Sequence, residues 1–218
     1  MTNVRCTFAA ALILGLFSAF PCAALDDPGA AQQSADAALA AQPVSLPDMA
    51  LGSADAPVTI IEFSSLTCPH CAAFEQNVFP MLQSQYIDTG KVRFVSREFP
   101  LDLKAASGSM LARCVANGDT PKYFEVVDML FKRQEGLVQN TLETMNDIGK
   151  HFGMDEDAVT NCVKTQPLLD KISADQKFAF EQLKVDATPY FFVNGQRLRG
   201  SMSFEELEEK IKPLLKQR

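Results

Sequence analysis

Residues 58–75 read VTIIEFSSLTCPHCAAFE, an apolar run that leads into two cysteines three positions apart. The β-branched run Val58–Phe63 is typical of a buried strand. A helix is predicted from Cys68 onward, with Pro69 in its first turn, where a missing N–H costs little, and with Pro80 kinking or splitting it. The two cysteines are therefore expected where a strand meets a helix.

The rest of the chain predicts an α/β core interrupted by helices. A second strand is expected over 91–99, and no strand-like run follows before residue 185. Two strands then meet at Asn194-Gly195, a dipeptide typical of a two-residue hairpin, and Ser203 with Glu206 has capping-box spacing for a last helix. This order predicts a thioredoxin-like α/β core with a helical insertion domain.

These patterns divide the chain into five parts. Residues 1–24 are expected to be a signal peptide, and 25–47 a flexible lead rich in Ala, Gln and Asp. The core is expected over 48–101 and 186–218, with the helical insertion over 102–185. An oligomerisation helix in the lead is the alternative, but no sustained apolar heptad supports it.

The signal peptide is predicted from three features. Arg5 precedes the apolar run FAAALILGLFSAF over 8–20, and small residues follow up to Ala24. A retained membrane anchor is the alternative, but the run is shorter than the about 20 residues of a membrane span. A lipoprotein modified at Cys22 is disfavoured by the Phe-Pro pair before that cysteine. We therefore expect export to the periplasm as a soluble protein.

Composition and charge exclude nucleic-acid partners. The chain has 27 acidic and 20 basic residues, a formal net charge of −7, and no Lys/Arg run. Phosphate binding instead needs a concentrated basic surface. Loss of Cys6 and Cys22 with the signal peptide would leave four of the six cysteines. An even number of cysteines in an exported chain is typical of a compartment where disulfides persist.

The Cys68–Cys71 spacing predicts a redox-active pair. At a helix N-terminus the Cys68 sulfur would face unpaired N–H groups and the positive end of the helix dipole, and both stabilise a thiolate. A protonated His70 would add to this effect. Cys71 would lie deeper as the resolving thiol. A target thiolate that attacks the oxidised pair would then be left carrying the disulfide.

Three other uses of this pair are weaker. A zinc site needs about four ligands, but the chain has two histidines and no second C-x-x-C, so no metal is expected. A c-type haem needs His directly after the second cysteine, and residue 72 is Ala. A purely structural bridge between positions so close stabilises little by loop closure. No cofactor is expected.

Two segments together resemble one family. They are EFSSLTCPHCAAFE over 62–75 and TPYFFVNG over 188–195. In combination they resemble the DsbA-type thiol–disulfide oxidoreductases of thioredoxin-like fold, and most of all their alphaproteobacterial branch. The likeness runs from about Leu51 to the C-terminus and includes the helical insertion.

The resemblance implies a role for each matching residue. Cys68 is the exposed nucleophile, Cys71 its buried partner, and Pro69-His70 the intervening pair whose histidine stabilises the thiolate. Thr188-Pro189 match the cis-proline loop that faces the dithiol and pairs with substrate, although a trans proline opening a strand is the alternative. The best-known oxidases have valine in place of this threonine, and several isomerases and reductases have threonine. The direction of electron flow therefore stays open.

Two acidic residues match supporting positions of the same family. Glu62 matches a buried acid that carries the Cys71 proton, although a strand carboxylate can instead point to water. Glu75 matches an acidic residue near the same site, but its position on a helix also suits an ordinary exposed carboxylate.

Cys114 and Cys162 fall on two segments of the insertion, 111–115 and 159–163. We expect them to form a structural disulfide that pins two helices. A second redox centre is the functional alternative, but neither residue has a cysteine or a Pro-rich turn beside it. Two free buried thiols are the remaining alternative.

We therefore expect an enzyme, a protein dithiol–disulfide oxidoreductase that donates the Cys68–Cys71 disulfide to reduced or unfolded exported proteins. A membrane quinone-linked partner of DsbB type would re-oxidise it. An isomerase or a dedicated thiol reductant of the same compartment is the alternative, although the lead is short for the dimerising module of an isomerase, and a monomer is expected. A non-redox chaperone or binding module is the weaker alternative in the same compartment, and it would keep its activity when Cys68 is changed.

Overall fold

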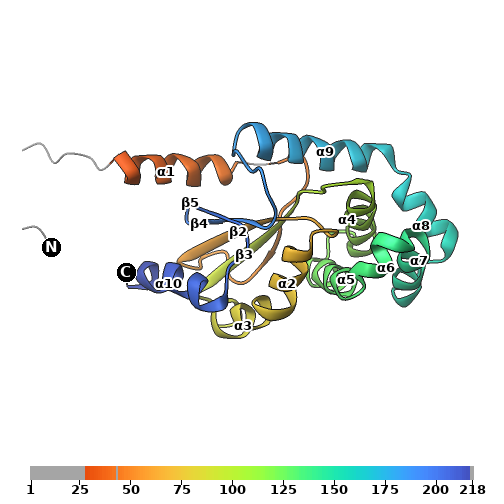
Figure 1. Ribbon diagram of the computed structural model, residues 1–218, viewed down its shortest axis with the longest axis horizontal. Helices are drawn as coiled ribbons and strands as arrows, with labels where there is room; N and C mark the ends of the chain where they lie inside the picture. The colour runs from red at the N-terminus through yellow and green to blue at the C-terminus, as the bar shows by residue number, and fades with distance from the viewer. Residues whose placement is uncertain (1–27, 43, 217–218) are drawn as a thin grey trace, which may run out of the picture.

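The computed structural model describes residues 28–42 and 44–216, and in them five strands form one mixed sheet (Figure 1). The strand order is β1-β3-β2-β4-β5, with β2 and β3 parallel and the other neighbours antiparallel. The central strand β2 is the one that leads into the two cysteines. The strands are β1 (Met49–Leu51), β2 (Val58–Ser64), β3 (Val92–Glu98), β4 (Tyr190–Val193) and β5 (Gln196–Arg199).

The strands expected from the sequence are confirmed, and one strand was missed. β4 and β5 form the expected hairpin, and its two turn residues have the positive φ angles that such a turn requires, 44° at Asn194 and 86° at Gly195. The missed strand is β1, whose three residues pair with β3. Three residues are too few for an alternating pattern, so the pairing with β3 defines this strand.

Helices cover both faces of the sheet (Figure 1). Strand β4 is buried on both of its faces, because Phe191 and Val193 join one apolar cluster while Tyr190 and Phe192 join another. The expected helix after Cys68 is split, as the proline predicted. One face is covered by α2 (Pro69–Asn77), α3 (Phe79–Leu82), a π-helical turn (Gln83–Ile87) and α10 (Phe204–Leu215), and the other by α1 (Pro28–Ala40) and the end of α9 (Gln166–Glu181).

The helical insertion is also confirmed, and it packs at one end of the sheet (Figure 1). Asp102, Asp119 and Asp155 cap three of its helices, since each carboxylate accepts a hydrogen bond from an N–H three residues on. No helix in the described ranges is long and apolar enough to cross a membrane. Before α9 the insertion comprises α4 (Leu103–Ala116), α5 (Thr120–Lys132), α6 (Gln134–Gln139), α7 (Thr141–His151) and α8 (Glu156–Val163).

The expected flexible lead over 25–47 needs correction in the part that the structure describes. There the chain forms α1, which packs on the sheet instead of extending into solvent. The Asp36 carboxylate accepts two hydrogen bonds from the Arg197 guanidinium, both at 2.6 Å, and Ala40 is buried. Because α1 packs through small alanines and one ion pair, its sequence has no heptad of apolar residues that would have predicted this contact. The predicted signal peptide lies outside the described residues.

A buried ion pair ties the insertion to the sheet. The Arg113 guanidinium of α4 donates to both carboxylate oxygens of Glu98, at the end of β3, at 2.5 and 2.7 Å. The Tyr123 hydroxyl of α5 donates to the same carboxylate at 2.9 Å. Both charged side chains are less than a tenth exposed. Removing one partner would leave a buried charge unpaired, at a cost of about 3–5 kcal/mol.

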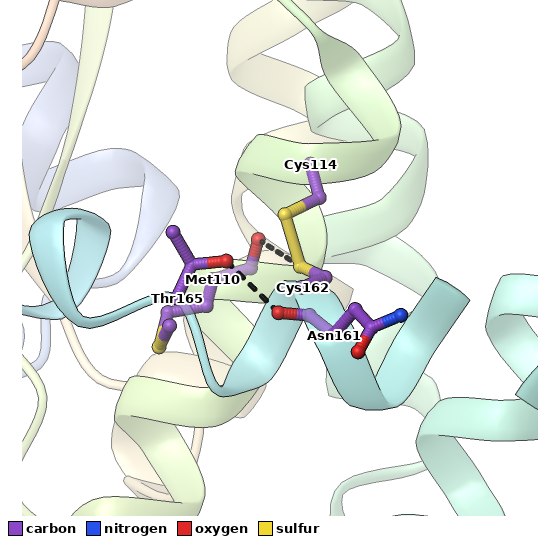
Figure 2. The surroundings of a disulfide bond; sticks show 5 residues. All are labelled: Met110, Cys114, Asn161, Cys162 and Thr165. Carbon is purple, nitrogen blue, oxygen red and sulfur yellow. Dashed lines mark hydrogen bonds between the residues drawn. A yellow bond between two sulfur atoms is a disulfide. The ribbon is translucent and has the colours of Figure 1, made fainter. Parts of the chain in front are cut away.

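A disulfide joins α4 to α8 within the insertion (Figure 2). It links Cys114 and Cys162, as expected, with their Cα atoms 6.2 Å apart and 48 positions between them in sequence. The Cys162 sulfur lies 3.3 Å from the Met110 carbonyl oxygen, a contact and not a hydrogen bond, because a disulfide sulfur carries no hydrogen. The bridge therefore closes a long loop between two helices that already pack together.

Replacing both Cys114 and Cys162 by alanine should lower the free energy of unfolding by up to about 4 kcal/mol, because the bridge restricts the unfolded chain. Urea denaturation of the variant and the wild type measures this difference. Excess reductant should remove the difference by opening the wild-type bridge. Equal urea midpoints without reductant would contradict a stabilising bridge.

Candidate active site

The two cysteines of the site lie where β2 runs into α2. Cys68 is the N-cap residue of α2, with extended backbone angles, and Pro69 is at the start of the helix. The Cys68 N–H donates to the Ser65 carbonyl oxygen at 3.0 Å, which closes the turn between strand and helix. The Cys68 sulfur therefore lies at the positive end of the α2 dipole, as the sequence predicted.

The insertion holds this turn through a residue that the sequence did not single out. Gln134 Nε2, at the start of α6, donates to the carbonyl oxygens of Leu66 at 2.9 Å and Cys68 at 3.0 Å. From the other side, the Thr67 hydroxyl donates to the Asp102 carboxylate at 2.8 Å. No local pattern marks Gln134, which is 66 positions from Cys68 and meets it only through the fold.

The Cys68 sulfur is stabilised as a thiolate. Its pKa is lowered to about 5, first because the Cys71 side chain hydrogen bonds to this sulfur. The Thr188 side chain and the backbone N–H groups of Cys71 and His70 lower it further, while burial opposes them. Cys68 is 5% exposed and Cys71 1%, so both are buried, and the expectation of an exposed Cys68 is wrong because the Thr188–Pro189 loop packs against its sulfur.

The loop that faces Cys68 contains the expected cis proline. The Thr188–Pro189 peptide bond is cis, and the Cys68 thiol donates to the Thr188 carbonyl oxygen at 3.2 Å. The Thr188 hydroxyl is buried and has no hydrogen-bond partner among the described residues. Loss of the thiol proton removes the donor to the carbonyl and creates an acceptor for this hydroxyl, so the loop can accommodate both protonation states.

Cys71 has the opposite acidity from Cys68. Burial raises the pKa of Cys71 far above its usual range, and the hydrogen bond to Cys68 and the charge of Glu62 raise it further. Glu62 is only 3% exposed, so the carboxylate facing water is excluded for this residue. Burial likewise raises the pKa of Glu62 well above its usual range, followed by the charge of Glu75. Glu62, whose neutral form is favoured by burial, therefore lies close to the buried thiol.

Glu75 is not an ordinary exposed helix residue. It lies on α2 one turn after Cys71, and only 8% of it is exposed. Burial raises its pKa to about 8; Asp128 also raises it and Lys132 lowers it. The helical pattern does not reveal this burial, because the covering side chains come from α5.

The remaining predicted residues lie outside this buried centre. Pro69 and His70 are exposed at the surface beside Cys68, and His70 contributes its backbone N–H to the thiolate. The bridged Cys114 and Cys162 belong to the insertion and do not join the redox pair. Within 28–42 and 44–216, no three His, Cys, Asp or Glu side chains gather as a metal site would require.

This arrangement suits thiol–disulfide exchange. A low-pKa thiol is a good leaving group and is present as thiolate at neutral pH. Its buried neighbour has a high pKa and therefore takes up a proton when their disulfide opens. The cis-proline loop lies beside the pair, where its backbone could pair with an extended target chain.

The chain is similar to known proteins that are named for this chemistry. A family profile described as thioredoxin matches residues 45–213. A Rickettsia bellii protein named as a protein-disulfide oxidoreductase is 34% identical over 150 residues, which are 68% of this chain and 57% of that protein. The chain thus spans little more than half the length of this relative. Disulfide bond formation protein D of Bacillus subtilis is 26% identical, with 82% of each chain covered.

Solved structures show the same fold. Wolbachia pipientis alpha-DsbA1 matches with a TM-score of 0.71 and 31% identity, over 79% of this chain and 93% of that one. Bacillus subtilis BdbD matches with a TM-score of 0.69 at 24% identity, over 78% of this chain and 93% of that one, and shows the fold alone. The chain therefore belongs to the thioredoxin family, in its DsbA-type group of thiol–disulfide oxidoreductases.

Proposed function

We propose that this protein is a periplasmic dithiol–disulfide oxidoreductase that donates its Cys68–Cys71 disulfide to cysteines of exported proteins. The observation that carries this proposal is the unequal acidity of the pair, with the pKa of Cys68 lowered to about 5 and that of buried Cys71 raised. A stable Cys68 thiolate favours the reduced pair over its disulfide. The disulfide is therefore readily passed to a target.

The reaction has two exchange steps. A target thiolate attacks the Cys68 sulfur, so a target–Cys68 bond forms while the Cys68–Cys71 bond breaks, and Cys71 leaves with the electron pair and takes up a proton. A second target thiolate then attacks the target sulfur of this mixed disulfide, and Cys68 leaves as a thiolate. The target loses two electrons and two thiol protons. The pair gains both electrons and one proton, and the other proton goes to solvent.

Neighbouring residues have distinct parts in this scheme. Glu62 is the proton donor to Cys71, because it is buried beside the thiol and its raised pKa favours its protonated form. Thr188 and Pro189 present backbone to an extended target, next to the sulfur under attack. His70 lies exposed beside Cys68, where its charged form would favour the thiolate.

The sequence and the chemistry support the proposed compartment and partners. The apolar run over 8–20 and the small residues after it support export through a cleaved signal peptide. Reduced or unfolded exported proteins are the targets, and the protein acts as a monomer. A membrane quinone-linked protein of DsbB type would re-oxidise the pair, because each cycle leaves two electrons on it.

Thr188 supports one alternative within the same chemistry, an isomerase or a dedicated reductant. Trapping the thiols of growing cells with acid and then alkylating them distinguishes these uses, because an oxidase is held with Cys68–Cys71 oxidised and a reductant with the pair reduced. In vitro, the oxidised protein should form disulfides in a reduced, unfolded protein, and Cys68→Ala should abolish this. Retained activity in Cys68→Ala would instead indicate a non-redox chaperone or binding module.

Reduced protein treated with iodoacetamide at about pH 6 should be alkylated at Cys68 and not at Cys71, because only the thiolate reacts. The labelling rate should be half-maximal near pH 5, where the pKa of Cys68 lies, and level off above it. Mass spectrometry of the labelled peptides measures both. Cys68→Ala should lose the fast reaction, and first labelling at Cys71 would overturn the assignment of nucleophile and resolving thiol.

Thr188→Val should raise the pKa of Cys68 and make the protein about tenfold less oxidising at equilibrium, because the thiolate loses a hydroxyl donor. Equilibration with glutathione buffers measures this without target turnover, which valine also alters through substrate release. Thr188→Ser keeps the hydroxyl and should behave like the wild type. An unchanged or more oxidising equilibrium in Thr188→Val would rule out the hydroxyl's role.

A further inference from the structure

The three residues that precede α2 are all held by the helical insertion. Gln134 Nε2 donates to the carbonyl oxygens of Leu66 at 2.9 Å and Cys68 at 3.0 Å. The Thr67 hydroxyl between them donates to the Asp102 carboxylate at 2.8 Å. Of these contacts, the bond from Gln134 is the one that reaches the backbone of Cys68 itself.

The Leu66 side chain also packs closely against the insertion. A Cβ atom on Gly108, in the middle of α4, would lie 2.8 Å from Leu66 Cδ1 and 3.5 Å from Leu137 Cδ2. Glycine inside a helix is unfavourable relative to alanine, so the close approach of these two leucines gives the bare backbone a reason. Leu137 is fully buried and lies three residues after Gln134 on α6. Helix α6 is therefore anchored firmly enough to hold the Gln134 amide in place.

The Cys68 carbonyl oxygen accepts hydrogen bonds from two sides. Besides the bond from Gln134, it accepts the Ala72 N–H at 3.2 Å, in the first turn of α2. The backbone N–H groups of His70 and Cys71, in the same turn, hydrogen bond to the Cys68 sulfur. A rotation of the Cys68 backbone that broke the bond from Gln134 would therefore also turn the sulfur away from its donors.

The bond from Gln134 matters most when the pair is reduced. In the oxidised protein the Cys68–Cys71 bond itself holds Cys68 on the first turn of α2. Reduction removes this covalent link, so the position of the Cys68 sulfur then depends on non-covalent contacts alone. A thiolate also gains more than a disulfide sulfur from each N–H that points at it. Loss of the Gln134 donors should therefore destabilise the reduced state more than the oxidised state.

We infer that Gln134 is a positioning residue of the redox pair: by holding the Cys68 carbonyl from the insertion, it keeps the N–H donors of α2 aimed at the sulfur and so favours the reduced pair. This deepens the proposed function, on which it rests. Gln134 acts through the backbone of Cys68 and not on the reacting sulfur. The insertion thereby shares in setting how oxidising the protein is, in addition to completing the fold.

The test is the equilibrium of each variant with glutathione, in which two glutathione thiols become one disulfide as the Cys68–Cys71 bond opens. Alkylation and mass spectrometry of the Cys68 and Cys71 peptides measure this pair separately from the Cys114–Cys162 bridge. Gln134→Met keeps the length of the side chain but removes its N–H donors. It should be about fivefold less oxidising than the wild type, the effect of about one hydrogen bond, and the pKa of Cys68 should rise.

Gln134→Glu separates hydrogen bonding from packing, because glutamate has the shape of glutamine. Its ionised carboxylate cannot donate to either carbonyl, and it adds a negative charge close to the Cys68 backbone. At pH 7 this variant should therefore be less oxidising than Gln134→Met. A role in packing alone predicts instead that Gln134→Glu behaves like the wild type. The same variant decides the question if methionine disturbs the fold.

Gln139→Met is the matched control, because Gln139 lies on the same short helix and its amide donates to Glu135 of that helix. This variant should keep the wild-type glutathione equilibrium and the wild-type pKa of Cys68. Circular dichroism and the urea midpoint of each oxidised variant report changes in fold separately from changes in the redox equilibrium.

Two results would count against different proposals. A wild-type glutathione equilibrium and a wild-type pKa of Cys68 in Gln134→Glu would overturn the positioning role of Gln134. Failure of the oxidised wild type to form disulfides in a reduced, unfolded protein would overturn the proposed function. The glutathione equilibrium needs no protein target, so it judges the role of Gln134 in either case.

Discussion

A stable thiolate at the N-terminus of α2 is the constraint on which the rest of this structure depends. The stabilisation needs the backbone N–H groups of the first turn and the Cys71 thiol to point at one sulfur, so the turn between β2 and α2 has to keep a single geometry. Gln134 holds the carbonyls of this turn from α6, and Asp102 holds Thr67 from the start of α4. The helical insertion is therefore a direct support of the site.

The insertion needs its own attachment to serve as that support. The buried pair of Arg113 and Glu98 provides it, because β3 and α4 each contribute one charge and neither can be exposed without leaving the other unpaired. The disulfide between Cys114 and Cys162 then joins α4 to α8, starting at the residue next to Arg113. Rigidity thus extends from the sheet to the outer helices through one segment of α4.

The proposed disulfide exchange at Cys68 depends on buried acid–base groups. Cys68 is the thiol proposed to exchange disulfides, and Cys71 and Glu62 behind it are among the most buried polar groups of the core. Burial of the Glu62 and Glu75 carboxyl groups so close together disfavours their charged forms and lowers the stability of the fold. The same burial raises the pKa of both groups and so favours the protonated form, which is the form that a proton donor to Cys71 requires. Stability and function therefore make opposite demands at this place.

Short-range signals predicted much of this protein. Strand β2, the helix at Cys68, the Asn194-Gly195 hairpin and the last capping box could be inferred because each depends on adjacent residues. Four other features could not be inferred: the pairing of β1, the docking of α1 through Asp36, the hydrogen bonds from Gln134 and the burial of Glu75. Each of these depends on a partner far along the chain, and a local sequence pattern does not show which distant residues come together in the fold. The cysteine pair was thus visible in the sequence, whereas the surroundings that set its two acidities came from the packing of the insertion against the sheet.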